Sequence, residues 1–278
     1  MTTACYNKSS QRKKQRNKTM PFNNHVAVVT GAGGNIGRAI CRQLGAAGVH
    51  VAATDVSLDA VTKTATDLQA LGYDVRPYQQ DVTSEENVQS SFAQIFADFG
   101  KVDVLINNAG VWCHHDGGCR HFLETISDDE WKRIIDINLL GTFHCMKQVI
   151  PGMAERRFGR IVNLGSIAGN SGLPGAADYS AAKAAVIMLT KVAAMENAKR
   201  GITVNSVSPG MVARGDVTGP NNGTWLGRNG LADEIARVIV FLADDDAGYI
   251  TGVDVPVDGG RILGPHNFNI NAEGKFLS

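Results

Sequence analysis

A tyrosine and a lysine four residues apart, Tyr179 and Lys183, are the pair of side chains best suited to proton transfer in this sequence. Residues 179–199 predict a helix, on which positions four apart share one face. A free phenol has a pKa of about 10 and is a poor base at neutral pH. A fixed ammonium beside it would favour the phenolate and lower that pKa, so the pair could act as a general acid and base.

Two more polar residues stand where chemistry is possible. Ser166 follows a predicted strand at 160–164, and Asn138 lies inside a predicted helix at 128–153. Each candidate also has an ordinary interpretation, because a serine after a strand is often a turn residue and a Tyr–Lys pair is often a surface pair. An asparagine inside a helix is unfavourable, so Asn138 requires a structural or catalytic reason.

A glycine-rich turn separates the first predicted strand from the first predicted helix. Glycines there permit a tight turn and let the backbone approach a pyrophosphate at the helix N-terminus. The turn contributes six candidate cofactor-binding residues: Gly31, Gly33, Gly34, Asn35, Ile36 and Gly37. Asp55 ends the second strand, where a carboxylate would bind the ribose hydroxyls and repel a 2′-phosphate, which favours NAD over NADP. The alternative is that Asp55 caps the following helix.

Strands and helices alternate along the chain, which predicts an α/β fold with a doubly wound, Rossmann-like parallel sheet of about seven strands. The expected strands are 25–30, 49–54, 75–79, 102–106, 160–164, 204–207 and 254–257. The expected helices are 35–47, 58–71, 84–99, 128–153, 179–199 and 231–242. We expect one catalytic domain at 25–261, a basic disordered extension at 1–24, and a C-terminal extension at 262–278.

Composition fits an enzyme without disulfides. Net charge is zero, but residues 1–20 carry six Lys or Arg and no acid. We interpret that segment as a disordered extension, or Met20 as the natural start, and expect no nucleic-acid partner.

No apolar run could span a bilayer and no secretory signal is evident, so we expect no membrane partner and a cytoplasmic location. Five scattered cysteines favour a reduced intracellular protein.

The order and spacing of several motifs resemble the short-chain dehydrogenase/reductase family. The motifs are TGAGGNIG at 30–37, NNAG at 107–110, Asn138, Ser166, YSAAK at 179–183, a proline–glycine pair at 209–210 and VDGG at 257–260. The resemblance covers about residues 25–261. It implies an oxidoreductase and a homodimer or homotetramer that pairs the helices at 128–153 and 179–199.

The same resemblance assigns roles to individual residues. It implies that Tyr179 is the acid and base, that Lys183 holds the ribose and assists Tyr179, and that Ser166 hydrogen-bonds the reacting oxygen. It also implies that Asn138 keeps a water in a proton relay. Further expected cofactor contacts follow the third, fourth and sixth strands: Asp81, Val82, Asn108, Ala109, Gly110, Pro209, Gly210 and Val212.

Two positions depart from the family pattern. Asn35 replaces the middle glycine of the turn, which we expect to be tolerated because asparagine accepts a left-handed backbone. Arg214 stands where the family has a threonine near the cofactor, which puts those contacts in doubt. The segment 211–230 is short for a substrate lid, and the sequence leaves open whether it forms a trimmed lid or an open mouth.

The loop at 111–122 is the candidate substrate mouth. We expect Trp112 and either His114 or His115 to touch a polar substrate, although a mobile polar loop is an equal alternative. Its histidines and cysteines could bind a metal, but the spacing matches no compact zinc pattern, so we predict none. We expect His144 to be a packed helix residue.

The sequence as a whole predicts an oxidoreductase that uses NAD in preference to NADP. Its expected substrate is a small secondary alcohol or ketone, with polyols and sugars among the candidates. An alternative within the same fold is a 3-oxoacyl-carrier-protein reductase, against which Asp55 argues. A second alternative is a non-catalytic NAD-binding regulatory protein, against which the four catalytic candidates argue. The substrate and the direction of the reaction are open.

Overall fold

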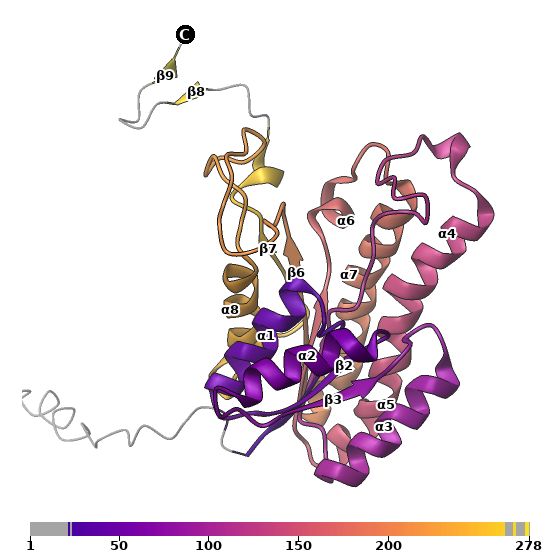
Figure 1. Ribbon diagram of the computed structural model, residues 1–278, viewed down its shortest axis with the longest axis vertical. Coiled ribbons are helices and arrows are strands. Elements are labelled where there is room, and N and C mark those ends of the chain that lie inside the picture. The colour runs from indigo at the N-terminus through magenta and orange to yellow at the C-terminus, as the bar shows by residue number, and fades with distance from the viewer. Residues whose placement is uncertain (1–21, 23, 265–268, 271–275, 278) are drawn as a thin grey trace, which may run out of the picture.

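Seven parallel strands form one sheet in the order β3-β2-β1-β4-β5-β6-β7 (Figure 1). The computed structural model describes residues 22, 24–264, 269–270 and 276–277. The strands are β1 (Val26–Thr30), β2 (His50–Asp55), β3 (Val75–Gln79), β4 (Val104–Asn107), β5 (Gly159–Leu164), β6 (Ile202–Pro209) and β7 (Asp254–Val257). The prediction of a doubly wound α/β sheet is confirmed.

Helices cover both faces of this sheet. They are α1 (Asn35–Ala46), α2 (Leu58–Gln69), α3 (Glu85–Phe99), α4 (Asp128–Ile135), α5 (Gly141–Glu155), α6 (Ile167–Ser171), α7 (Ala177–Asn197) and α8 (Ala232–Ala243). Helices α1, α2 and α8 lie on one face, and α3, α5 and α7 on the other (Figure 1).

Successive side chains of the buried strands point alternately into the two hydrophobic cores, one on each face of the sheet. Val29 of β1 points into the core under α1, α2 and α8, whereas Val28 points into the core under α3, α5 and α7. Successive side chains of a strand face opposite sides, so a strand covered on both faces must be apolar throughout. All five residues of β1 are buried, which explains the uninterrupted apolar run in the sequence.

Serine caps fix the starts of several helices. Ser84 Oγ accepts a hydrogen bond from the backbone N–H of Asn87 at 3.2 Å, as its position before the helix predicts. Ser57 and Ser127 make the equivalent bonds at the starts of α2 and α4. Gly100 ends α3 in the left-handed region with φ of 75°, a conformation that favours glycine.

Three features differ from the sequence expectation. The helix predicted at 128–153 contains a π-helical segment, Asp136–Leu140, between α4 and α5. The short helix α6 was not predicted, because five residues are too few for a periodic pattern. Phe22, assigned to the N-terminal extension, is 2% exposed and packs edge-on against His25, so the core begins earlier than expected.

The structure describes the two ends of the chain only in part. Residues 1–21, which carry the predicted basic extension, lie outside the described residues. The C-terminal extension, expected to be irregular, begins with a 3₁₀ turn, η5 (Arg261–Leu263), and contains the two-residue strands β8 (Asn269–Ile270) and β9 (Phe276–Leu277). Over the described part of the chain, no helix combines the length and apolarity that a bilayer span requires.

The strand order reverses between β1 and β4, because β1 pairs with β2 on one side and β4 on the other. In open parallel sheets, ligands bind outside the carboxyl ends of the strands at this point. A cavity of about 830 Å³ opens there, and a second of about 570 Å³ adjoins it.

Candidate active site

The turn between β1 and α1 forms one wall of the larger cavity. Gly31 has φ of 64°, and a Cβ there would lie 2.9 Å from Ala109 Cα. A Cβ on Gly37 would clash with the carbonyl oxygen of Gly31 and lie 2.8 Å from Ala32 Cα. These two positions therefore require glycine, one for conformation and both for space. The backbone surface they leave at the start of α1 suits a pyrophosphate.

Asn35 occupies the turn for a different reason from the one expected. It is the first residue of α1 and has no left-handed backbone. Its Nδ2 donates to the carbonyl oxygen of Ala213 at 2.9 Å. The asparagine thus ties the start of α1 to the segment after β6, which the sequence had suggested only as a tolerated substitution.

Asp55 lines the larger cavity at the end of β2. Its Oδ2 accepts from the N–H of Gly33 at 3.0 Å, and its Oδ1 accepts from the N–H of Ser57 at 3.0 Å. A Cβ on Gly33 would lie 3.0 Å from Asp55 Oδ2, so the glycine makes room for the carboxylate. The helix cap itself is Ser57, which argues against a capping role for Asp55.

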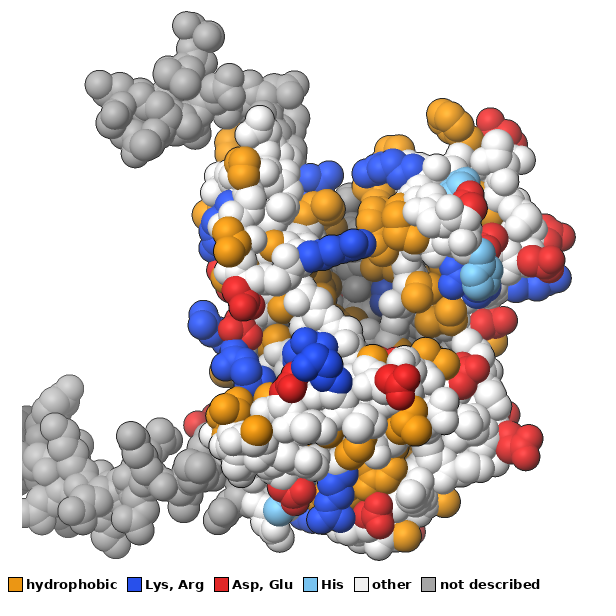
Figure 2. All heavy atoms as spheres, in the orientation of Figure 1, with side chains coloured by type: hydrophobic (Ala, Val, Ile, Leu, Met, Phe, Trp, Pro, Cys, Tyr) orange, Lys and Arg blue, Asp and Glu red, His pale blue; other side chains and the backbone are white. Residues whose placement is uncertain are grey.

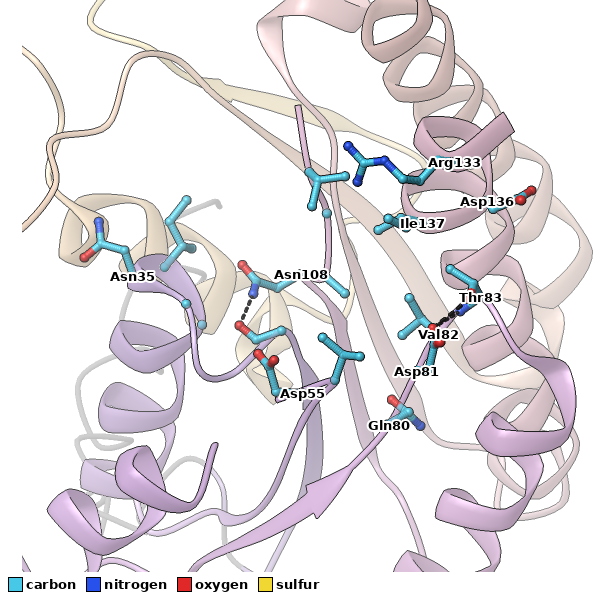
Figure 3. A pocket seen from close by; sticks show the side chains of 18 of the residues that line it. Asn35, Asp55, Gln80, Asp81, Val82, Thr83, Asn108, Arg133, Asp136 and Ile137 are labelled. Carbon is cyan, nitrogen blue, oxygen red and sulfur yellow. Dashed lines mark hydrogen bonds between the residues drawn. The ribbon is translucent and has the colours of Figure 1, made fainter. Parts of the chain in front are cut away.

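Most of the predicted cofactor residues surround this larger cavity. They are Gly31, Gly34, Asn35, Ile36, Gly37, Asp55, Asp81, Val82, Asn108, Ala109, Gly110 and Val212. Figure 3 shows Asn35 and Asp55 on one wall and Arg133, Asp136 and Ile137 on the other. Pro209 and Gly210 line the smaller cavity instead.

Asp81 is partly engaged within its own turn. Its Oδ1 accepts from the N–H of Thr83 at 2.9 Å and from the Thr83 hydroxyl at 2.7 Å (Figure 3). These bonds fix the carboxylate at the end of β3, on the border of the cavity. His144 stabilises the same stretch through a contact of 3.0 Å between Nδ1 and the carbonyl oxygen of Val82, so it is a packed residue as expected.

The NNAG motif joins β4 to the glycine turn. Asn108 Nδ2 donates to the carbonyl oxygens of Thr30 and Gly31 at 2.9 and 3.0 Å. Thr30 Oγ1 accepts from the N–H groups of Asn108 and Ala109. A Cβ on Gly110 would lie 2.7 Å from Asn138 Oδ1 and 3.3 Å from Lys183 Nζ. The motif therefore braces the cofactor side and leaves space for two catalytic candidates.

Asn138 is positioned by the π-helical segment. Its Nδ2 donates to the carbonyl oxygens of Val111 and Ile134 at 2.8 and 2.9 Å. Its Oδ1 is buried and has no hydrogen-bond partner among the described residues. A buried carbonyl oxygen normally has a partner, so this atom, turned toward Gly110 and Lys183, suits the water contact that the resemblance implies. Single-turn π segments often mark functional positions in helices.

Lys183 is buried at 4% exposure, with its Nζ 2.8 Å from the carbonyl oxygen of Leu164, to which it donates. Burial lowers the pKa of this ammonium to about 8. A lysine is rarely buried without a charged partner. No carboxylate hydrogen-bonds Lys183 among the described residues. The burial of this ammonium is therefore better explained by a role in function than by a contribution to stability.

Tyr179 and Ser166 lie at the smaller cavity together with Lys183. Burial raises the pKa of the Tyr179 phenol above its usual value, and a hydrogen bond with Ser166 acts in the opposite direction. The expected lowering by Lys183 is not seen, because Nζ lies 5.7 Å from the centre of the Tyr179 ring and donates to Leu164 instead. Ser166 also accepts from the N–H of Ala168 at 3.1 Å, as the cap of α6.

The two cavities meet at residues common to both walls: Ile36, Asn108, Gly110, Val111 and Val212. The four predicted catalytic residues, Asn138, Ser166, Tyr179 and Lys183, all line the smaller cavity. A ligand spanning both cavities would bring its inner end to Tyr179. The arrangement can therefore hold a dinucleotide in one cavity and a small reactant in the other.

The loop at 111–122 brings one of its three predicted substrate residues to the smaller cavity. Trp112 lines it, whereas His114 and His115 do not. His114 Nε2 lies 2.7 Å from Asp178 Oδ2, and its ring stacks on His121 at 4.1 Å. Asp178 Oδ1 also accepts from the N–H of Tyr179 at 2.7 Å. His114 thus contacts the helix start that carries Tyr179.

A disulfide links Cys113 to Cys119 and closes this loop. The expectation of a fully reduced chain is therefore wrong at this pair, which a count of scattered cysteines could not reveal. Cys41 and Cys145 are buried and free, and burial raises the pKa of both thiols to about 12. Within the described part of the chain, no three His, Cys, Asp or Glu side chains gather in a way that could hold a metal ion.

The segment 211–230 folds back along the end of the sheet. Val212 pairs with Gly230, and Arg228 forms an ion pair with Glu234 of α8 at 2.7 Å. Arg214 lines the larger cavity, so the departure from the family pattern places a cation beside the cofactor space.

Two residues of the smaller cavity were missed by the sequence analysis. Arg120 lies in the disulfide-closed loop and Arg261 in η5, and both line the cavity of Tyr179. The sequence contained only a weak signal for Arg120, namely its place in the candidate substrate loop. It contained none for Arg261, because only the fold brings the end of β7 to this site.

Comparisons with known proteins agree with this geometry. A family model described as short chain dehydrogenase matches residues 25–223. The chain is 40% identical over 248 residues to the 3-oxoacyl-[acyl-carrier-protein] reductase of Haemophilus influenzae, covering 86% of this chain and 98% of that protein. It is 40% identical over 253 residues to the Salmonella typhimurium enzyme of the same name, covering 88% of this chain and 100% of that protein.

Solved structures give the same result. An NAD⁺-bound xylitol dehydrogenase matches with a TM-score of 0.80 and 35% identity, covering 86% of this chain and 99% of that one. The crystal structure of gox2181 matches with a TM-score of 0.82 and 33% identity, covering 88% of this chain and 98% of that one.

Proposed function

Because the chain belongs to the short-chain dehydrogenase family, we propose that it transfers a hydride between NAD and a secondary alcohol or its ketone, with Tyr179 as acid and base. Membership itself makes the chain an NAD(P)-dependent oxidoreductase of CH–OH and keto groups. The observation that carries the proposal is the meeting of Tyr179, Ser166 and Lys183 in a cavity that opens onto the larger one.

The four catalytic residues have different roles in proton transfer. When bound, the cofactor held along the larger cavity would supply the hydride chemistry for the interconversion of alcohol and ketone. Tyr179 takes the hydroxyl proton during oxidation and returns one to the oxygen during reduction. Ser166, which hydrogen-bonds Tyr179, orients the reacting oxygen, and Lys183 supplies positive charge behind the phenol. Asn138 Oδ1 accepts a hydrogen bond from a water that connects Lys183 to solvent.

The protonation state of Tyr179 differs between the two directions of the reaction. A neutral phenol donates a proton to a ketone oxygen, and burial keeps the phenol in this form by raising its pKa. Oxidation requires the phenolate, which the positive charge of the oxidised nicotinamide would favour.

We propose NAD rather than NADP as the cofactor, because of Asp55. Its carboxylate is held by the N–H groups of Gly33 and Ser57 at the end of β2, so it cannot turn away without losing two hydrogen bonds. A fixed carboxylate accepts from ribose hydroxyls and repels a 2′-phosphate. The solved xylitol dehydrogenase that resembles this chain is itself NAD⁺-bound.

Replacing Asp55 with Ser should reduce the preference for NAD over NADP. Hydrogen bonds to a charged group contribute about 1.5–3 kcal/mol, so the ratio of kcat/KM values should change by about 10- to 100-fold. The control is Asp59→Ser, which removes an exposed carboxylate of α2 outside both cavities. An unchanged ratio in Asp55→Ser would remove the argument for NAD.

A 3-oxoacyl-carrier-protein reductase is the second candidate, because the curated relatives at 40% identity carry that name. Both candidates use the same catalytic residues and differ in substrate and cofactor. The test is turnover of NAD, NADH, NADP and NADPH by the purified protein, first with secondary alcohols, polyols and sugars, then with a 3-oxoacyl thioester. Faster thioester reduction with NADPH than alcohol oxidation with NAD would favour the second candidate.

We also propose a homodimer or homotetramer formed through α4, α5 and α7. These helices and the π-helical segment between α4 and α5 expose large apolar side chains: Trp131, Leu140, Phe143, Met188, Val192 and Met195. Apolar patches of this kind often mark interfaces. Sedimentation velocity at micromolar concentration should show an assembly that Met195→Asp weakens and Leu71→Asp, an exposed change next to α2, does not. A monomeric wild type would contradict the proposal.

We propose a cytoplasmic location, where the nicotinamide pool would be available. The Cys113–Cys119 disulfide argues against this location, because such bonds are rare in reducing compartments. Thiol labelling of the protein in intact cells tests this, because labelling of both cysteines is expected in the cytoplasm and protection of both would place the protein in an oxidising compartment.

A further inference from the structure

The smaller cavity carries a charge pattern that the hydride-transfer chemistry does not require. Its lining includes Arg120, Arg261 and Lys183, and none of the described residues that line it is Asp or Glu. The larger cavity is different, because its lining combines four carboxylates, Asp55, Asp81, Asp129 and Asp136, with three cations, Lys132, Arg133 and Arg214. Figure 2 shows the hollow on this face, with Lys and Arg side chains projecting at its edges.

Lys183 belongs to the catalytic group, so the two arginines are the unexplained cations. They come from segments far apart in the chain, Arg120 from the loop after β4 and Arg261 from η5 after β7. A guanidinium binds carboxylate and phosphate oxygens through two parallel N–H donors, which makes arginine the usual residue for recognising such groups.

Arg120 is held in place by the connection between α6 and α7. Its Nη1 donates to the carbonyl oxygen of Pro174 at 2.6 Å, and the N–H of His121 donates to Gly175 at 2.8 Å. Gly175 has φ of 81°, and a Cβ there would lie 3.1 Å from Arg120 Cβ. A side chain braced in this way loses little conformational entropy when it binds a ligand.

Arg261 is braced by a separate set of contacts. Its Nη1 donates to the carbonyl oxygen of Gly223 at 3.1 Å, and a Cβ on Gly223 would clash with that same Nη1. Asp258 fixes the start of η5, accepting from the N–H of Ile262 at 2.8 Å. The segment 211–230 thus contributes Gly223 as a support for Arg261.

We propose that the substrate carries an anionic group, a carboxylate or a phosphate, in addition to its reacting carbon–oxygen group, and that Arg120 and Arg261 bind it. This proposal rests on the proposed function, because it places the reacting oxygen at Tyr179 and the anion toward the two arginines. A cavity of about 570 Å³ accommodates such a small molecule.

Matched pairs of probes test the proposal with NAD(H) and, separately, NADP(H) at saturation. The carboxylate pair is acetoacetate and its neutral methyl ester, and the phosphate pair is dihydroxyacetone phosphate and dihydroxyacetone. In at least one pair, the KM of the anionic member should be at least about tenfold below that of the neutral member. The pair with the larger ratio identifies the anion.

Arg120→Leu and Arg261→Leu should each remove most of that ratio by raising the KM of the anionic probe far more than the KM of the neutral probe. Arg120→Lys and Arg261→Lys should restore part of it. Arg237→Leu, an exposed change on α8 that lines neither cavity, is the control and should keep the full ratio. Equal KM values within both pairs in the wild type, or a ratio that survives both Leu variants, would overturn the proposal.

Calorimetry with the same anions and cofactor separates this proposal from the proposed function. If no probe is turned over but an anion binds the wild type and not Arg120→Leu or Arg261→Leu, the anion site stands and the assigned reaction fails. If neither anion binds nor is turned over, the anion site is wrong whatever the reaction.

Discussion

Tyr179→Phe should lower kcat for NAD-linked turnover by about 10³-fold and leave cofactor binding nearly unchanged. The substitution keeps the buried aromatic ring in the first turn of α7. It removes only the hydroxyl that hydrogen-bonds Ser166. The reaction then lacks the group that takes or returns the proton at the reacting oxygen. Single-turnover kinetics with cofactor-binding calorimetry on the same protein would measure both quantities.

The matched control is Tyr249→Phe, because Tyr249 is fully exposed at 103% and lies in neither cavity. It should behave like the wild type in both measurements. If Tyr179→Phe kept activity within about tenfold of the wild type, Tyr179 would not be the acid and base. If the same variant lost cofactor binding as well, the hydroxyl would have a binding role that the structure does not assign to it.

The sheet could be predicted from the sequence because it depends on local patterns. Continuous apolar runs such as Val26–Thr30 identify strands covered on both faces, and the turn with Gly31 and Gly37 identifies the switch point. Helix starts were predictable where a serine cap such as Ser84 precedes the helix. In each case, the residues that determine the structure are neighbours in the chain.

The remaining features depend on contacts between distant segments. The π-helical segment at Asp136–Leu140 places Asn138 against Val111, a partner that lies 27 residues earlier in the chain. Asn35 bonds Ala213, which is 178 residues away. Arg261 reaches the site only because β7 ends beside β6. Composition and periodicity describe residues that are close in the chain, so they could not predict these contacts between distant residues.

The electrostatics of the catalytic pair show the same limit. Four-residue spacing correctly predicts that Tyr179 and Lys183 share a face of α7, and both line the smaller cavity. It does not predict that burial would dominate both side chains, raising the pKa of the phenol and lowering that of the ammonium. Burial is a property of the whole fold, and spacing describes only the helix.

Lys183→Met should have opposite effects on activity and stability. Loss of the charge behind Tyr179 should lower kcat by about 10²-fold. The free energy of unfolding at pH 7 should rise by as much as about 3 kcal/mol, because the folded protein no longer holds a buried ammonium whose pKa falls from 10.5 to about 8. Methionine has a similar length and carries no charge.

The pH dependence of this stability difference gives the stronger test. Below pH 8, Lys183 is protonated in both states and the full cost of burying the charge is present. Between about pH 8 and 10.5, the unfolded chain binds more protons than the folded protein at this residue, so wild-type stability rises relative to the variant. The advantage of Lys183→Met should therefore shrink through this range and disappear above it.

Urea unfolding of both proteins at pH 7 and pH 10 measures the effect. Lys191→Met serves as the control, since Lys191 lies two turns further along α7 and is exposed, and its replacement should change neither activity nor the pH dependence. A variant that is less stable than the wild type at pH 7 would mean that the bond from Nζ to Leu164 outweighs the cost of burial. In that case Lys183 would stabilise the fold, and its burial would no longer argue for a catalytic role.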